Sequence, residues 1–199
     1  MVYFERHILC AAPLAFVRLQ PFHQTVASIV LNYSCYEPNK LLHFRRLEQN
    51  GIKRQELSAF CEDVWSYAAE GTYFTIASLR KNGFYSKLFD LGFSDWFYAN
   101  MLLTDDRFGY GRFLNNLIFR KGASGVSMQA FLVFCVQSYD SIAVYDLIHE
   151  LNAQYACISN DRYDLIDKLR GTQVYYDEIL DRLYASAALY EHELNEMGD

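Results

Sequence analysis

The stretch from Thr72 to Gly122 constrains the fold of this chain more than any other segment. Within it, short apolar runs alternate with residues that begin or end helices. Hydroxyl residues, which cap free backbone N–H groups at helix starts, precede three of the runs: Thr75, Ser86 and Ser94. Glycines, which suit the left-handed position after a helix, follow two of them: Gly83 and Gly92. The pattern predicts three short helices, over 76–82, from 86 to just before 92, and over 95–103.

A β-hairpin is predicted after these helices. Asn115 and Asn116 lie between two apolar segments, and Asn tolerates the positive φ that tight hairpin turns require. Before the stretch, a longer helix is expected over Gln55–Glu70, because its apolar residues recur at three- and four-residue steps. Tyr73-Phe74 forms a brief extended piece. Helix, extended piece, helices and hairpin in this order are the layout of a winged helix, which predicts a mainly α fold.

The chain divides into three segments at two breaks. Asn50-Gly51 marks a turn or helix end, and Lys121–Gly125 is small and flexible. Residues 51–121 form the winged-helix-like unit, and residues 126–199 a further unit. Residues 1–50 are either an N-terminal helical extension or a degenerate unit, with helices expected over 24–33 and 39–49.

The segment after the linker repeats the order of the first unit. Ala130-Phe131 corresponds to Ala59-Phe60 in a first helix, and Ser141–Val144 to the extended Thr72–Thr75. Helices are expected over 145–154 and, capped by Asn160, over 161–170. A last helix is expected from Thr172 through Tyr184 and His192. No hairpin is expected there, so the second unit is predicted to be wingless.

The charge is distributed unevenly along the chain. Residues 1–121 hold 14 Lys/Arg and 11 Asp/Glu, a net charge of +3. Residues 122–199 hold 4 Lys/Arg and 13 Asp/Glu, a net charge of −9. Because an acidic surface repels a phosphate backbone, the second unit is not expected to bind nucleic acid.

Leu102-Leu103-Thr104-Asp105-Asp106-Arg107-Phe108, followed by a glycine-containing hairpin, resembles the end of HARE-type winged helices. That family includes the N-terminal domain of the bacterial RNA polymerase delta subunit. The resemblance covers about residues 55–121 and, more loosely, 126–185. It implies a winged-helix fold and a bacterial-type setting in transcription or DNA metabolism, and it supplies no catalytic residue.

Candidate nucleic-acid contacts lie within residues 80–121. The third helix of the stretch is aromatic and carries no Lys or Arg, so only its Asn100 resembles a base-reading side chain. Positive charges lie elsewhere and could hold phosphates of duplex DNA without reading its sequence. The candidate residues are Arg80, Lys81, Lys87, Asn100, Arg112, Arg120 and Lys121. An ordinary solvated surface and contact with an acidic protein remain alternatives.

Two aromatic clusters are candidate partner-binding sites. They are Trp96-Phe97-Tyr98 and Tyr175-Tyr176. Three adjacent helical residues point in three directions, so one small core does not accommodate all of them. Core packing accounts for most of these side chains, and the remainder favours contact between units or with a protein partner.

No catalytic motif is present, and we expect no enzyme activity, cofactor, metal site or small-molecule substrate. Asp177, Glu178 and Asp181 are interpreted as solvated charges on a helix. The apolar run near the N-terminus is too short for a membrane span. Five scattered cysteines with no C-x-x-C pair favour reduced thiols in the cytoplasm.

The sequence therefore favours a non-catalytic interaction or adaptor module associated with a DNA or transcription assembly. Two alternatives remain: a direct, weakly sequence-specific DNA-binding protein that uses its hairpin, and a structural domain of a larger protein.

Overall fold

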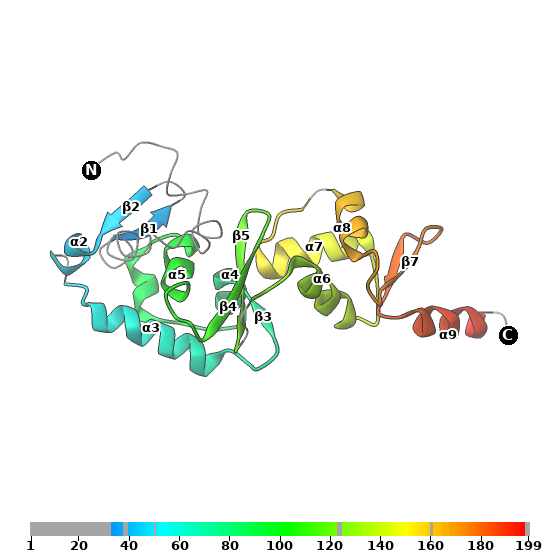
Figure 1. Ribbon diagram of the computed structural model, residues 1–199, viewed down its shortest axis with the longest axis horizontal. Coiled ribbons are helices and arrows are strands. Elements are labelled where there is room, and N and C mark those ends of the chain that lie inside the picture. Colours follow the sequence, from blue (N-terminus) through cyan, green and yellow to red (C-terminus); the bar gives the residue numbers. More distant parts are fainter. Residues whose placement is uncertain (1–32, 38–39, 50, 123–124, 160, 198–199) are drawn as a thin grey trace, which may run out of the picture. The chain divides into compact units, whose positions relative to one another are not determined.

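The structure is a computed structural model that describes residues 33–37, 40–49, 51–122, 125–159 and 161–197 (Figure 1). The chain forms two compact units, each built from two separate stretches of the sequence. The first unit comprises Met1–Tyr67 and Tyr85–Asp105, and the second comprises Ala68–Phe84 and Asp106–Asp199. The described residues are mainly helical, with small antiparallel sheets.

Among its described residues, the first unit contains a two-stranded hairpin and four helices. Strands β1 (Tyr33–Glu37) and β2 (Lys40–His43) pair antiparallel, and α2 (Phe44–Gln49) follows. The helix expected over 39–49 is thus a strand and then a helix, and most of the helix expected over 24–33 lies outside the described residues. The other helices are α3 (Arg54–Tyr67), the 3₁₀ helix η3 (Lys87–Leu91) and α5 (Asp95–Leu102).

Aromatic rings form the core of the first unit. Phe60 of α3 lies 5.8 Å from Phe89 and 5.7 Å from Tyr98, measured between ring centroids. Phe89 meets the Tyr98 ring edge-on at 4.9 Å, an arrangement that the quadrupoles of aromatic rings favour. The Tyr98 hydroxyl donates a 2.7 Å hydrogen bond to the Leu88 carbonyl, so the polar end of this buried ring has a partner. These contacts hold η3 between α3 and α5.

Helix α4 (Ile76–Lys81) begins at the expected cap. Thr75 Oγ1 accepts from the Ser78 N–H, and Ser78 Oγ accepts from the Thr75 N–H, which completes a capping box. Ser86 caps η3 through a single hydrogen bond, which its Oγ accepts from the Leu88 N–H. Ser94 occupies the N-cap position of α5 without a capping hydrogen bond from its side chain. Gly92 adopts the predicted left-handed conformation after η3, with φ of 69°.

A three-stranded sheet opens the second unit beside α4. Strand β3 (Tyr73–Phe74) pairs with β5 (Asn116–Lys121), which pairs in turn with β4 (Phe108–Phe113). The sheet order is therefore β3-β5-β4, with all pairs antiparallel. Leu114 and Asn115 close the predicted hairpin between β4 and β5, which we call the first hairpin.

The same succession of elements follows in the second unit. Helix α6 (Met128–Gln137), strand β6 (Ser141–Ala143), α7 (Val144–Tyr155) and α8 (Arg162–Leu169) match the expected order. The N-cap of α8 is Asp161, whereas Asn160 lies outside the described residues. We call α3 to β5 the first repeat and α6 to β8 the second repeat.

The expectation of a wingless second repeat is wrong. Strands β7 (Tyr175–Asp177) and β8 (Arg182–Tyr184) form a second hairpin, where a helix was expected. Strand β8 pairs with β6, so the sheet order β6-β8-β7 matches β3-β5-β4 strand for strand. The last helix, α9 (Ala187–Met197), begins only after β8. The consecutive aromatic residues of β7 suit a strand better than a helix.

The core of the second unit joins the first hairpin to α6. Phe131 of α6 is fully buried, and its ring lies 5.6 Å from Tyr73 and 5.6 Å from Phe113, two residues of the first sheet. Leu147 and Leu183 of the second repeat belong to the same buried cluster. The compact units therefore do not coincide with the ranges 51–121 and 126–199, because strands of the first repeat pack on helices of the second.

Candidate functional site

Helix α5, the candidate reading helix, is largely buried. Strand β1 lies against it, and Phe97 and Tyr98 have no exposed surface. Asn100 is half-buried, and its side-chain amide donates a 2.7 Å hydrogen bond to the Trp96 carbonyl one turn earlier. A base-reading amide must instead project from an exposed helix into a groove. The side-chain amide of the candidate reader Asn100 is therefore bonded to the backbone of its own helix.

The first aromatic cluster is mainly core. Phe97 lies 4.3 Å from Phe93 and 5.2 Å from Tyr98 between ring centroids. Phe97 and Tyr98 are thus inaccessible to a partner, which corrects their assignment as partner-binding residues, while Trp96 is half-buried. Phe97 and Tyr98 are buried because aromatic residues in and after η3 pack on them: Phe89 contacts Tyr98, and Phe93 contacts Phe97.

The cations of the first hairpin differ in their surroundings. The Arg120 guanidinium lies 5.3 Å from the centre of the Tyr73 ring. Lys121 Nζ lies 3.4 Å from a Glu70 carboxylate oxygen and 3.5 Å from the Ala68 carbonyl. Arg112 is exposed, and its Nε donates to the Leu114 carbonyl at 3.4 Å. All three predicted phosphate contacts therefore have partners inside the second unit, and Arg112 is the one whose side chain is also exposed.

The remaining cationic candidates are exposed. Arg80 and Lys81 lie in the last turn of α4, where positive charge complements the helix dipole. Lys81 Nζ also lies 3.4 Å from the Ala153 carbonyl of α7. Lys87 is the first residue of η3 and, like Asn100, belongs to the first unit. The other five candidates belong to the second unit, so no single unit gathers the whole predicted set.

The tip of the first hairpin is docked on the C-terminal end of α7. The Asn116 side-chain amide donates to the Tyr155 carbonyl at 3.0 Å, and that of Asn115 donates to the Ala156 carbonyl at 3.3 Å. The Asn115 side-chain oxygen accepts from the Ile158 N–H at 3.1 Å. A helix leaves its last carbonyls without partners inside the helix, and these two Asn side chains satisfy two of them. The turn residues predicted from sequence thus also connect the two repeats.

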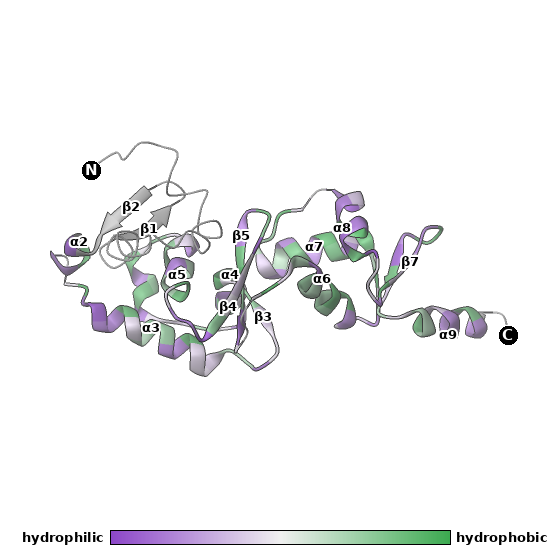
Figure 2. Cartoon of the chain, in the orientation of Figure 1, coloured by the Kyte–Doolittle hydropathy of each residue, from purple (hydrophilic) through white to green (hydrophobic). Residues whose placement is uncertain are grey.

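The second hairpin presents a different tip. Ile179 is 94% exposed and Leu180 is 51% exposed (green beyond β7 in Figure 2). Sequence reasoning missed this hairpin because its loop contains no glycine or asparagine. The local signal is Asp177, whose buried carboxylate accepts from the Ile179 N–H at 2.7 Å and the Leu180 N–H at 3.1 Å. Asp commonly stabilises turns in this way.

The tyrosine pair of the second cluster lies on β7. Tyr175 is at the surface, 36% exposed, and its ring stacks on Tyr190 of α9 at 4.3 Å between centroids. The Tyr176 hydroxyl donates a 2.9 Å hydrogen bond to Asp181, which also forms a 2.9 Å ion pair with Arg162. Tyr175 and Tyr176 therefore brace the second hairpin at its base and near its tip.

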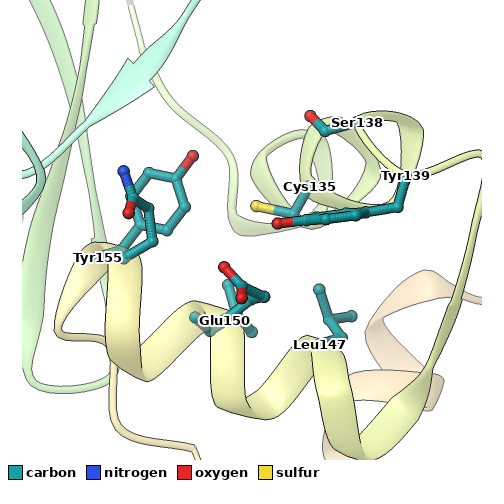
Figure 3. Close-up of a pocket in the computed structure, with 8 residues that line it drawn as sticks. Cys135, Ser138, Tyr139, Leu147, Glu150 and Tyr155 are labelled. Atoms are coloured by element: carbon teal, nitrogen blue, oxygen red, sulfur yellow. The ribbon is translucent and has the colours of Figure 1, made fainter. Parts of the chain in front are cut away.

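A small pocket of about 60 Å³ lies between α6 and α7 (Figure 3). Its lining includes Cys135, Tyr139, Glu150 and Tyr155. Burial raises the pKa of the Cys135 thiol and of the Tyr155 hydroxyl. Burial and the neighbouring Glu150 carboxylate raise the pKa of Tyr139. Because the thiolate is the reactive form of cysteine, a thiol with a raised pKa is a poor nucleophile.

Metal and membrane candidates were sought across the described ranges. No group of three or more His, Cys, Asp or Glu side chains in those residues could hold a metal ion. Asp177, Glu178 and Asp181 lie around the second hairpin and not on a helix, and two of them stabilise its loop. In the same part of the chain, no helix combines the length and apolar character needed to cross a bilayer.

Comparisons with known proteins found no counterpart for this chain. No protein-family model, curated protein or solved structure matches it.

Proposed function

We propose that this chain is a non-catalytic protein-interaction module built from two winged-helix-like repeats and associated with a DNA or transcription assembly. The observation that carries the proposal is the repeated hairpin. The two sheets share one strand order, yet one tip contacts a neighbouring repeat and the other displays Ile179 and Leu180 to solvent. Exposed aliphatic side chains on an ordered element are typical of protein contacts.

The winged-helix-like assignment is supported by the element order of both repeats. A helix, a short strand, further helices and a hairpin occur twice, and each short strand pairs with the second strand of its hairpin. The association with transcription or DNA metabolism is supported by the Leu102–Phe108 pattern, which resembles HARE-type domains.

The surroundings of the candidate DNA contacts favour a protein partner. The amide of Asn100 is bonded to its own helix, Lys121 is paired with Glu70, and the tip of the first hairpin is docked on α7. A duplex would have to compete with each of these contacts. The competing hypothesis of direct DNA binding is favoured by the exposure of Arg80, Lys81 and Arg112 in the second unit.

Affinity purification of the tagged full chain from its native host tests the interaction hypothesis. We expect the same protein partner in independent preparations, at levels above a tag-only control. Repeated absence of any such partner would refute the proposal.

Duplex DNA binding, followed by fluorescence anisotropy, tests the competing hypothesis. Phosphate contacts give an affinity that falls steeply with salt, so binding should be strongest near ~50 mM salt. Absence of binding under that condition excludes the DNA hypothesis. Salt-dependent binding that is lost when Arg80, Lys81 and Arg112 are replaced together would support it against the interaction hypothesis.

A further inference from the structure

The tip of the second hairpin combines high exposure with an ordered backbone. Ile179 is 94% exposed and Leu180 is 51% exposed, whereas Leu183 on the adjoining strand is fully buried. Neither of these two aliphatic side chains belongs to the buried core. Their apolar surface is therefore available to a partner that removes it from water.

Side-chain contacts fix both ends of this loop. At its start, Asp177 accepts hydrogen bonds from the Ile179 and Leu180 N–H groups. At its end, Asp181 has a left-handed backbone with φ of 51°, and its carboxylate is held by Arg162 and by the Tyr176 hydroxyl, both at 2.9 Å. A loop that is already ordered loses little conformational entropy on binding.

The first hairpin shows how this architecture uses a hairpin tip. Its loop contacts the end of α7 through Asn115 and Asn116, and its flanking Phe113 is buried against Phe131. A tip at the same place in the strand order therefore already contacts the end of a helix within this chain. The second tip has a matching position and lacks the two Asn side chains, so its contact must be mainly apolar.

The acidic charge of this part of the chain indicates which side chains a partner would place around the apolar contact. Glu178 is exposed beside Ile179, and residues 122–199 hold 13 Asp/Glu against 4 Lys/Arg. Electrostatic complementarity favours basic side chains opposite this surface. The same charges repel nucleic-acid phosphates and anionic lipids, and they oppose a symmetric contact between two acidic tips of this chain.

We propose that the tip of the second hairpin inserts Ile179 and Leu180 into an apolar socket, rimmed by Lys or Arg, on a different folded protein. This inference rests on the proposed interaction function and assigns it a specific site. The apolar pair supplies the buried centre of the contact, and Glu178 faces the basic rim.

Site-directed photo-cross-linking of the full chain in its native host tests the inference. Benzoylphenylalanine replaces Ile179 in one sample and Tyr145, which is 75% exposed on α7, in a matched control. We expect one protein to be cross-linked only from position 179. Its cross-linked peptide, mapped by mass spectrometry, should contain apolar residues flanked by Lys or Arg, and the yield should fall as salt increases.

Several results would overturn the inference: no cross-link from position 179, the same products from position 145, or cross-links to a second copy, lipid or nucleic acid. Ile179→Asp together with Leu180→Asp should weaken affinity capture of the partner by about tenfold or more, as for central interface residues. If this variant, folded by circular dichroism, keeps the partner, the site assignment fails while the interaction function stands. If the unmodified chain captures no partner, the interaction function itself fails.

Discussion

The two hairpins have the same strand order but different surroundings. The first hairpin, β4–β5, contributes Phe113 and Ile118 to the core that contains Phe131 of α6, and its tip is bonded to the end of α7. The second, β7–β8, carries a tip with Ile179 almost fully exposed. Strand pairing is common to both, so it does not determine the use of the hairpin. The loop residues determine that use. The first loop carries Asn amides that bind helix carbonyls, and the second loop carries exposed aliphatic side chains.

The largest expected effect tests whether the first hairpin is part of the second repeat's core. Phe131→Ala removes a fully buried ring that contacts Tyr73, Phe113 and Tyr155. We expect a loss of about 3–5 kcal/mol in the free energy of unfolding, from lost burial and a cavity. Urea denaturation measures it. A loss below ~1 kcal/mol would show that the hairpin and α6 do not share a core.

A smaller loss is expected from crowding the edge of the first hairpin. A Cβ added at Gly111 would lie 2.1 Å from the Val126 carbonyl oxygen, so strand β4 and the segment at Val126 must separate. Gly111→Ala should cost about 1–3 kcal/mol, as for other overpacked sites. Gly125→Ala is the matched control, since a Cβ there meets nothing within 4 Å. Equal stability of the two variants would contradict this close approach.

The docked tip should contribute less than the aromatic core. Asn116→Ala removes the amide that bonds the Tyr155 carbonyl, at an expected cost of about 1–2 kcal/mol in the free energy of unfolding. The companion variant Leu114→Ala changes an exposed residue of the same loop and should be nearly neutral. If both variants unfold at the same urea concentration as the parent, the tip is not held at α7 in solution.

The alkylation rate of Cys157 reports whether the tip of the first hairpin is docked at the end of α7. Burial raises the pKa of Cys157 from 9.0 to about 12. A raised pKa makes the thiolate much scarcer than in a free thiol at pH 8, which should slow alkylation strongly. Residue-resolved mass spectrometry after iodoacetamide treatment measures the rate. Asn116→Ala should accelerate it, and alkylation at the rate of a free peptide would contradict the burial of this thiol.

The raised pKa of Cys157 also predicts that the protein loses stability at alkaline pH. The folded-state pKa of Cys157 lies above the unfolded value, so its contribution is complete below pH 9 and is lost as pH rises toward about 12. The free energy of unfolding should therefore decrease over this interval. Cys157→Ala should reduce that decrease, and an identical pH profile for parent and variant would contradict the assignment.

The smallest expected effect lies at the exposed tip. Ile179→Ala should change the free energy of unfolding by no more than about 0.5 kcal/mol, because the side chain is 94% exposed. The contrast with Phe131→Ala separates a residue that stabilises the fold from one that is available to a partner. A loss above ~1 kcal/mol would show that Ile179 packs within the chain.

Local sequence signals predicted the first repeat well. The N-cap at Thr75, the left-handed Gly92 and the hairpin turn that includes Asn115 each depend on a few neighbouring residues, and each is present in the structure. The second hairpin was missed because its turn relies on Asp177 and its strands on pairing with β6, a contact distant in sequence. Long-range pairing leaves only a weak trace in a single sequence.

The candidate site was predicted less completely than the fold. Asn100 and Tyr98 have the residue types of contact positions, yet the Asn100 amide is bonded to its own helix and Tyr98 lies in an aromatic core. Their burial depends on packing that no local pattern encodes. Tyr175, a candidate partner contact expected on a helix, lies at the surface on β7, and Ile179 was overlooked because it too was expected within a helix.

The docking of the first hairpin has a practical consequence for dividing the chain. The glycine-containing segment Gly122–Gly125 is the natural place for an expression boundary or a recombination junction. A cut there would separate Phe113 from Phe131 and expose both faces of one aromatic core. The fragment beginning after Gly125 should therefore aggregate or fold poorly on its own, although it contains every helix and strand of the second repeat. The first hairpin and the second repeat therefore belong on one fragment in any division of the chain.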